Sequence, residues 1–298
     1  EKLHIPESSS ESTLTSVHRL IDEAVRIMEE RFDTEEGGFG SGMKFPEPMN
    51  YTILLRHWAR TGADESIRML DKTLTKMAEG GMYDQLGGGF HRYSTDRYWR
   101  IPHFEKMLYD NALLAKLYID MAQATKQDLY SEVPRDIFKY ILSEMTSPEG
   151  AFYSGQDADT DGEEGGYYFW KMKEFLDLLG PRNAKVMARH FGVTSSKGTT
   201  QKNVLYIKES IENLVKLEGI AIFELDHILR TSKEILLQAR RKRSRPFTDQ
   251  KIITGWNGLM ITAFASGYMV LHGKNYLKVA IRAGEFLWNN MWTENGIL

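Results

Sequence analysis

The sequence predicts an all-α protein built as a toroid of helical hairpins. Apolar residues recur at three- and four-residue spacing along most of the chain, as on one face of an amphipathic helix. Several of these segments end in a short glycine-containing sequence with a following hydrophobic residue. These sequences, which we call helix-end marks, are residues 36–39, 79–83, 149–153 and 294–297. The first two marks enclose one helical hairpin. Marks that recur after each hairpin are typical of a chain built from repeated helix pairs. An alternative is that unrelated helices happen to end in similar turns.

The expected helices fall into an inner and an outer set. Their approximate ranges are 14–28, 49–60, 64–79, 104–124, 129–146, 171–191, 219–243, 257–272 and 275–292. The very apolar segments 105–124 and 257–272 are expected to form an inner ring, wrapped by amphipathic outer helices. Strand-like residues are confined to 150–154, 166–170 and 203–207. Long loops interrupt the repeat at 80–103 and 147–170. Within them, segments 87–103 and 154–170 each leave a hairpin at an equivalent point, and we therefore expect these two segments to meet at one end of the toroid.

Composition excludes several classes of function. Lys and Arg total 38 against 41 acidic residues, so no basic surface for sequence-blind nucleic-acid binding is expected. The absence of cysteine excludes a disulfide framework, a thiol nucleophile and a zinc–thiolate site within these 298 residues, and fits a reducing compartment, the cytoplasm. We predict no metal and no cofactor. Segment 252–273 carries no formal charge, yet its polar residues and four glycines indicate a buried helix rather than a membrane span.

The two ends predict a piece of a longer protein. The chain starts on a polar stretch without methionine and stops just after a turn has been entered. We expect residues 1–12 to be a linker from an absent N-terminal domain, and residues 13–298 to be one helical barrel domain, incomplete within these residues.

The richest chemical segment is 87–111, GGGFHRYSTDRYWRIPHFEKMLYDN. A polar cluster at the opening turns of an otherwise buried helix is where a pocket mouth would lie, and His103, Met107 and Asp110 are expected on one face of that helix. Candidate acid–base residues are His91, His103, Glu105 and Asp110. Candidate substrate-binding residues are Arg92, Tyr93, Trp99, Tyr109 and Asn111. The alternative is a capped helix in which His103 and Asp110 are satisfied core partners.

A second cluster is the acidic run 156–164. It begins like a calcium loop, but Tyr168 stands where the bidentate glutamate belongs, so a weak cation site or a solvated loop are the alternatives. Asp157 and Asp159 are further candidate acid–base residues, able to orient a histidine, and Trp170 is a candidate stacking residue.

A third cluster opens the second buried helix. Trp256 and Asn257 could offer a stacking face and an amide to a ligand, or could cap and fill the barrel. Just before it, the basic run 240–245 resembles a polyanion patch, although cations at a helix C-terminus also offset the helix dipole.

Three long motifs carry a family resemblance. GGGFHRYSTDRYWRIPHFEKMLYDNALLA, DADTDGEEGGYYFW and DQKIITGWNGLMI closely resemble the spermatogenesis-associated protein 20 family, in the same order and across nearly the whole chain. The resemblance implies an N-terminal thioredoxin-like domain, absent here, followed by an (α/α)6 barrel of which this chain is the first part. That barrel is similar to those of N-acylglucosamine 2-epimerases and related glycan-active enzymes.

Three hypotheses for function follow. The first is a carbohydrate-active enzyme, an epimerase or isomerase of the N-acylglucosamine 2-epimerase type or a glycosidase-like hydrolase, with a sugar as small-molecule substrate. The second is a non-catalytic module that binds a ligand or client for the attached thioredoxin-like domain, and the third is a helical scaffold.

The first hypothesis requires particular side chains. For epimerisation we expect His91 or His103 to line the main cavity within hydrogen-bond reach of a carboxylate. Hydrolysis would instead need two carboxylates about 5 Å or about 6.5–9.5 Å apart. The candidates for that pair are Glu105, Asp110, Asp157 and Asp159.

Overall fold

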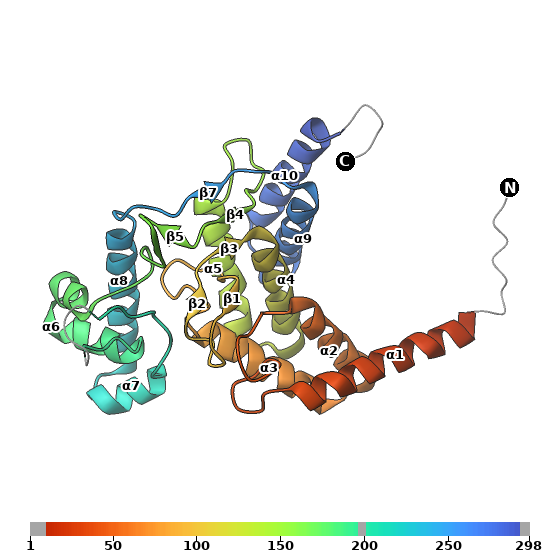
Figure 1. Cartoon of the computed structure of the whole chain (residues 1–298), viewed down its shortest axis with the longest axis horizontal. Coiled ribbons are helices and arrows are strands. Elements are labelled where there is room, and N and C mark those ends of the chain that lie inside the picture. The colour runs from red at the N-terminus through yellow and green to blue at the C-terminus, as the bar shows by residue number, and fades with distance from the viewer. Residues whose placement is uncertain (1–9, 196–200, 293–298) are drawn as a thin grey trace.

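A computed structural model describes residues 10–195 and 201–292 of the chain, and that part is mostly helical (Figure 1). Its helices are α1 (Ser10–Arg31), α2 (Pro48–Thr61), α3 (Asp64–Glu79), α4 (Leu108–Thr125), α5 (Asp128–Glu144), α6 (Met172–His190), α7 (Ile211–Glu218), α8 (Ile222–Arg240), α9 (Thr254–Leu271) and α10 (Tyr276–Asn290). Helix α1 begins inside the segment 1–12 that was expected to be a linker, and residues 1–9 lie outside the described residues.

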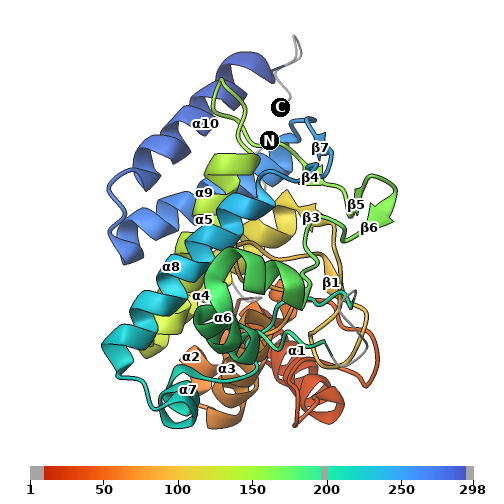
Figure 2. The ribbon, with the colours of Figure 1, turned by 90° about the vertical axis from the view of Figure 1, so that its left-hand side faces the viewer.

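Two rows of helices confirm the predicted toroid layering. Helix α4 packs between α2 and α9, and these three form the inner row (Figures 1 and 2). Each inner helix pairs with the next outer helix along the chain, giving the hairpins α2–α3, α4–α5 and α9–α10, while α1 packs on α2. Because α4 and α9 are apolar on most sides, they can pack against neighbours on both flanks, as expected for 105–124 and 257–272.

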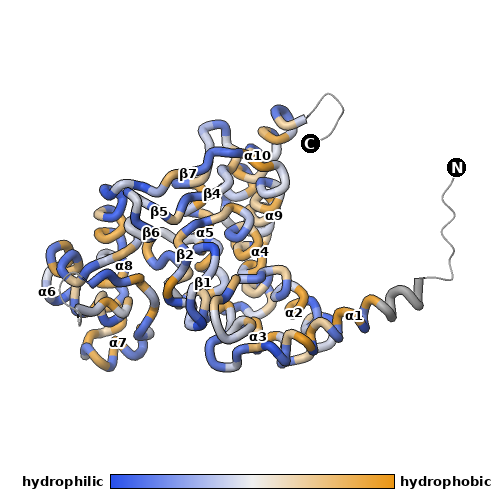
Figure 3. The backbone as a smooth tube through the Cα atoms, in the orientation of Figure 1, coloured by the Kyte–Doolittle hydropathy of each residue, from blue (hydrophilic) through white to orange (hydrophobic). Residues whose placement is uncertain are grey.

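The core lies between the two rows, and hydrophobic colours mark α4 and α9 in Figure 3. Phe138 of α5 stacks on Phe264 of α9 with ring centroids 4.1 Å apart. Gly267, one turn further along α9, leaves room for the same ring: a Cβ there would lie 2.6 Å from Phe138. A glycine at this position therefore allows the outer helix to approach the inner one closely.

Helices α6, α7 and α8 form a lobe beside the two rows, on the left in Figure 1. They enclose a second apolar cluster around Trp170, Phe175 and Phe191. The sequence prediction was wrong in detail here. The expected helix 219–243 corresponds to α8, but α7, which precedes it and ends at Gly219 with φ 63, was not predicted. The expected helix 171–191 is kinked at Gly180, where φ is 73.

Strands in the described residues are two-residue pieces in the loops. They are β1 (Tyr93–Ser94), β2 (Pro102–His103), β3 (Lys106–Met107), β4 (Gly155–Gln156), β5 (Asp159–Thr160), β6 (Glu163–Glu164) and β7 (Thr248–Asp249). They pair antiparallel as β1–β2, β3–β4–β7 and β5–β6. The segments expected as strands at 150–154, 166–170 and 203–207 instead contribute mainly isolated bridges, Thr146 with Phe152 and Trp170 with Asn203.

The prediction that the two long loops meet at one end is confirmed. His103 Nδ1 of the first loop lies 2.7 Å from Oε1 of Glu164 in the second, and the His91 ring meets Tyr168 of the second loop edge to face, with centroids 4.6 Å apart. The helix expected from residue 104 starts only at Leu108, because residues 102–107 are taken up by β2 and β3. His103 and Glu105 are therefore not on the helix that carries Asp110.

The helix-end marks 36–39 and 149–153 belong to one repeated turn, whereas the mark 79–83 lies at the end of α3, and its turn has the equivalent Gly-Gly-Phe sequence at 88–90. Isolated bridges close the turns after α1, α3 and α5, joining Phe32 to Phe39, Tyr83 to Phe90 and Thr146 to Phe152. The fourth mark, 294–297, lies outside the described residues. In the described part of the chain, no helix, α9 included, is long and apolar enough to cross a membrane.

Candidate functional site

An open cleft of about 400 Å³ lies at the N-terminal ends of the inner helices α2 and α4. It is lined by Phe45, Pro46, Glu47, Pro48, Met49, Asn50, Arg92, Tyr109, Asp110 and Leu113. Asn50 and Asp110 are each the third residue of their helix. Free backbone N–H groups and the helix dipoles therefore face this end of the barrel, and they favour electron-rich groups of a ligand.

Asp110 is the group in the cleft best placed for proton transfer. Its side chain is 7% exposed, and its Oδ2 has no hydrogen-bond partner. Burial, opposed by the charge of Arg92 and assisted by that of Glu105, raises the pKa of Asp110 to about 7. A carboxyl group with that pKa holds or releases a proton at neutral pH.

Arg92 and Tyr109 form the polar wall of the cleft. The Nη1 of Arg92 donates to Oε2 of Glu105 at 2.8 Å, and Tyr109 lines the cleft together with Arg92. The Tyr109 ring meets Trp256 edge to face, with centroids 4.8 Å apart. The predicted residues Arg92, Glu105, Tyr109, Asp110 and Trp256 are therefore brought together, with Trp256 behind the wall.

His103 and Tyr93 stand next to this group without lining the cleft. His103 Nδ1 lies 2.7 Å from Oε1 of Glu164, and its Nε2 lies 3.8 Å from Oε2 of Glu105. The Tyr93 ring is stacked between His103 and Phe45, at centroid distances of 5.0 and 4.7 Å. His103 thus links β2 to the hairpin β5–β6.

His91 is buried and its contacts are those of a structural residue. It is 2% exposed, and its Nδ1 lies 2.8 Å from the carbonyl oxygen of Phe104. Burial, assisted by the charge of Lys106, lowers the pKa of His91 to about 3. The expectation that one histidine would both line the main cavity and contact a carboxylate is wrong. His103 contacts two carboxylates but does not line the cleft, and His91 bonds to a backbone carbonyl oxygen.

The acidic run does not join the site. Asp157 and Asp159 are exposed, and the run folds into the hairpin β5–β6, whose turn has Asp161 at φ 54 and Gly162 at φ 77. An Asp-Gly pair favours such a turn because both residues tolerate positive φ. Among the residues that the structure describes, no three His, Asp or Glu side chains lie close enough together to hold a metal ion.

Two predicted stacking residues are core residues. Trp99 is fully buried, and its Nε1 donates to the carbonyl oxygen of Glu36 at 2.9 Å. Trp170 is 1% exposed and is covered by the guanidinium of Arg243, 4.1 Å from its ring. Neither ring is available to a sugar.

The two predicted amide ligands are also engaged. Asn111 and Asn257 both bond to the backbone of a phenylalanine in the turn beside them, Phe90 and Phe152 respectively. Their amides therefore hold the barrel together, and the structural alternative for Asn257 is the one the contacts favour.

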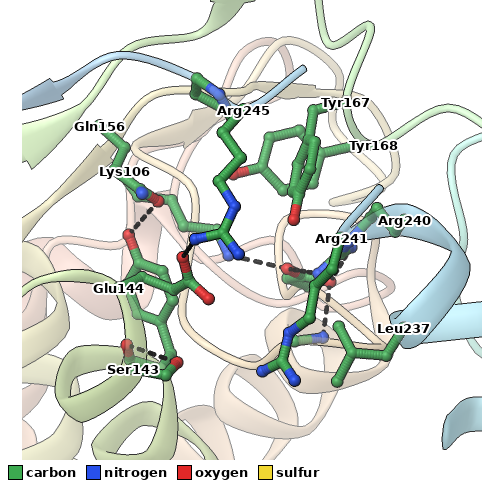
Figure 4. A pocket seen from close by; sticks show the side chains of 14 residues that line it. Lys106, Ser143, Glu144, Gln156, Tyr167, Tyr168, Leu237, Arg240, Arg241 and Arg245 are labelled. Atoms are coloured by element: carbon green, nitrogen blue, oxygen red, sulfur yellow. Dashed lines mark hydrogen bonds and ion pairs between the residues drawn. The ribbon is translucent and has the colours of Figure 1, made fainter. Parts of the chain in front are cut away.

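Sequence reasoning missed a buried charge network around Asp84 (Figure 4). Asp84 accepts two bonds from Arg240, at 2.7 and 2.8 Å, and one from Lys106 Nζ at 2.9 Å. The basic run 240–245 is therefore not simply a set of cations at a helix end: Arg240 is buried, and Arg243 donates to the carbonyl oxygens of Tyr167 and Phe169.

A repeated sequence pattern could have revealed this network. Asp33 and Asp84 both stand four residues before a Gly-Gly-Phe sequence, at the start of equivalent turns. In each turn the aspartate Oδ1 accepts backbone N–H groups and its Oδ2 accepts a buried lysine, Lys44 in the first copy and Lys106 in the second.

Comparison with curated proteins identifies close relatives. Human spermatogenesis-associated protein 20 is 35% identical over 294 residues, which is 89% of this chain, and the rat and mouse proteins of that name are 34% identical over the same length. The chain spans about 37% of the length of each of these relatives. No protein-family model matches the chain.

Solved structures with a similar arrangement of helices are more distant. Cellobiose 2-epimerase from Spirochaeta thermophila is 13% identical, with a TM-score of 0.45, over 98% of this chain and 89% of that one. A D-mannose isomerase is 10% identical, with a TM-score of 0.43, over 99% and 90%. A family 76 glycoside hydrolase from a bovine Bacteroides thetaiotaomicron strain is 13% identical, with a TM-score of 0.36, over 86% and 50%.

Proposed function

This chain belongs to the spermatogenesis-associated protein 20 family, and from that premise we propose that its cleft processes a sugar by acid–base chemistry. The observation that carries the proposal is Asp110, a carboxyl group with an unpaired, buried oxygen and a pKa raised to about 7 in a cleft of about 400 Å³. Perturbed titrating groups inside a cleft are typical of catalytic sites.

The composition of the cleft suits a sugar ring. Pro46, Pro48 and Leu113 offer apolar surface to the faces of the ring, while Arg92 and Asn50 offer donors to its hydroxyl groups. A cleft of this size can take one or two sugar units.

We also propose that the protein is located in the cytoplasm, a reducing compartment, with which the absence of cysteine agrees.

In an isomerase, Asp110 would remove the proton from the carbon next to the carbonyl group and return it to the former carbonyl carbon. In an epimerase, the enediolate would turn its opposite face to Asp110 before the proton returns to the same carbon. The Asp110 pKa near 7 makes both directions accessible at the same pH, so a single carboxyl group can serve as base and then as acid. Arg92, beside it, would stabilise the negative charge that develops on the carbonyl oxygen. This role replaces the histidine base expected from the sequence.

We also propose how the longer protein is divided into domains. Residues 13–298 would form part of an (α/α)6 barrel, and the longer protein would add a thioredoxin-like domain and further hairpins. The chain spans 37% of its human relative, which leaves length for both.

The test is proton exchange with solvent. The protein is incubated in D₂O with a panel of aldoses, ketoses and N-acylated aminosugars, and deuterium at the carbon next to the carbonyl is followed by NMR. An epimerase or isomerase incorporates deuterium, and Asp110→Asn abolishes incorporation while binding persists. Asp120→Asn, in the same helix but paired with Lys116, is the matched control and retains the rate. Absence of exchange and of binding across the panel would refute a sugar-processing site.

A second function, a non-catalytic docking site, is favoured by the rim of the cleft. Met49 is 61% exposed and Phe45 is 47% exposed, and both line the opening. Such apolar side chains suit an extended segment of a client protein. In this case ligands bind without deuterium exchange, and Met49→Ser weakens binding whereas Asp110→Asn does not.

A further inference from the structure

A narrow polar cavity lies where α5, β3 and the C-terminal end of α8 meet (Figure 4). Its ionisable lining is unbalanced. Four cationic side chains face two carboxylates there: Lys106, Arg240, Arg241 and Arg245 against Asp84 and Glu144. Arg241 and Arg245 are exposed, whereas Lys106 and Arg240 are buried, so it is the charge of these last two that water reaches poorly.

The pairing within the lining does not remove this excess. Glu144 is occupied by Arg245, 3.1 Å away, so that pair is balanced in itself. Asp84 alone serves both Arg240 and Lys106, whose side chains are 5% and 1% exposed. The Nε of Arg240 is buried and has no hydrogen-bond partner. One carboxylate thus compensates two buried cations, and an uncompensated buried charge is costly.

The equivalent network in the preceding hairpin provides an internal comparison. There Asp33 binds Lys44 at 2.7 Å and Arg97 at 2.8 Å, the same combination of one aspartate, one lysine and one arginine. However, Arg97 has a second carboxylate partner, Glu35, at 3.0 Å, and its side chain is 31% exposed. The first network is therefore neutral and partly hydrated, whereas the second is buried and lacks the second carboxylate.

The size of the cavity limits what could supply that charge. It offers about 30 Å³ to the centre of a water-sized sphere, and a single water needs about 10–15 Å³ on this measure. The space admits a monatomic ion or two waters and is too small for a sugar or a phosphate ester. The rings of Tyr140 and Tyr168 lie 4.3 and 5.2 Å from Lys106 Nζ, and they stabilise the cation without neutralising it.

We propose that this cavity binds one small monovalent anion of halide size, near Lys106 and Arg240 but beside the Asp84 carboxylate that already bridges them. The anion supplies the second negative charge that Glu35 supplies to the first network. Because Arg240 is the last residue of α8, the occupied site holds the lobe α6–α8 against the barrel. This site is separate from the cleft at Asp110, and it stands whether or not the cleft processes sugars.

The first test measures the melting temperature of the full chain at constant ionic strength, with sodium gluconate replaced stepwise by sodium chloride or bromide. We expect a saturable rise of a few degrees with either halide, because a ligand that binds only the folded state stabilises it by mass action. A melting temperature that does not change when gluconate is replaced by either halide would overturn the proposal.

A variant that supplies the charge from within sharpens this test. Gln156 lines the cavity and lies opposite Lys106 in the β3–β4 pair, so Gln156→Glu places a carboxylate there with almost no change in shape. The halide effect should disappear in this variant. Gln123→Glu makes the same chemical change on the exposed surface of α4 and should leave the effect intact. A halide effect that survives in Gln156→Glu would place the ion elsewhere and contradict the proposal.

Crystals of the unaltered protein grown in bromide give a readout that does not depend on whether a variant folds. We expect an anomalous peak inside the cavity, next to Lys106 Nζ or the guanidinium of Arg240. A cavity without that peak, in crystals that show bromide at other positions, would equally refute the site.

Discussion

Asn111 and Asn257 occupy the same position in two successive inner helices and make the same contacts. Each is the fourth residue of its helix, α4 or α9. Asn111 Oδ1 accepts from the N–H of Phe90 at 2.8 Å while its Nδ2 donates to the Phe90 carbonyl oxygen at 3.0 Å. Asn257 binds Phe152 in the same way, at 2.8 and 2.9 Å. In each case one side-chain amide satisfies both the N–H and the carbonyl group of a phenylalanine in a buried turn. Equivalent contacts therefore join each of the two inner helices to the turn beside it.

Replacing either asparagine by alanine should lower the free energy of unfolding by about 1–3 kcal/mol, because a buried N–H and a buried carbonyl lose their partner. Urea denaturation measures this loss. The double variant should show roughly the sum of the two losses, since each asparagine serves a different turn. Asn290→Ala, at an exposed helix end, is the control and should change stability by less than about 0.5 kcal/mol. A loss confined to one of the two sites would contradict their equivalence.

The helix layering was predictable because it follows from local patterns. Period, helix-ending glycines and the very apolar segments that become α4 and α9 all depend on neighbours in the sequence. Failures occurred where a distant segment decided the structure. Residues 102–107 continue the helical pattern, yet they form strands because β4 and Tyr93–Ser94 are available to pair with them.

The site was half predictable for the same reason. Arg92, Tyr109 and Asp110 are close in sequence and were singled out together. The partner of Asp84, in contrast, is 156 residues away, and nothing local to Arg240 distinguishes it from the exposed cations beside it. Trp99 was misassigned because its burial depends on the turn at Gly38, where a Cβ would lie 2.6 Å from the indole ring.

The pH dependence of stability provides a direct test of Asp110. Its pKa is raised from 3.8 to about 7 in the folded protein, so the folded state keeps a proton that the unfolded chain loses between these values. Stability should therefore fall as pH rises through this window, by up to about 4 kcal/mol at about 1.4 kcal/mol per pKa unit, and level off above pH 7. Asp110→Asn should remove this contribution. An unchanged slope in the variant, measured by urea denaturation from pH 4.5 to 8, would contradict the raised pKa.

Removal of the Asp84 charge should be among the most destabilising single changes in the chain. Asp84→Asn leaves Lys106 and Arg240 buried without a carboxylate, which should cost about 3–5 kcal/mol. Thermal and urea unfolding measure this loss, and protease cleavage in α6–α8 should increase, because Arg240 no longer ties that lobe to the barrel. Asp226→Asn, an exposed change on α8, serves as control. Comparable stability of the two variants would show that the network contributes little.

His91 and His190 should remain neutral throughout the physiological range. Burial is the main cause that lowers their pKa values, to about 3 and about 4, and each Nδ1 lies within 2.9 Å of a backbone carbonyl oxygen, that of Phe104 or Glu209. In the unfolded chain both imidazoles bind a proton near pH 6.5, whereas in the folded state they stay unprotonated at that pH. Stability should therefore fall as pH drops below about 6.5. His91→Asn and His190→Asn keep a donor near the carbonyl but cannot titrate, and each should make that decline shallower by one proton. Heteronuclear NMR of the imidazole nitrogens should show both rings uncharged at pH 5.5. A His91 ring that is charged at that pH would instead return it to the list of candidate acid–base residues.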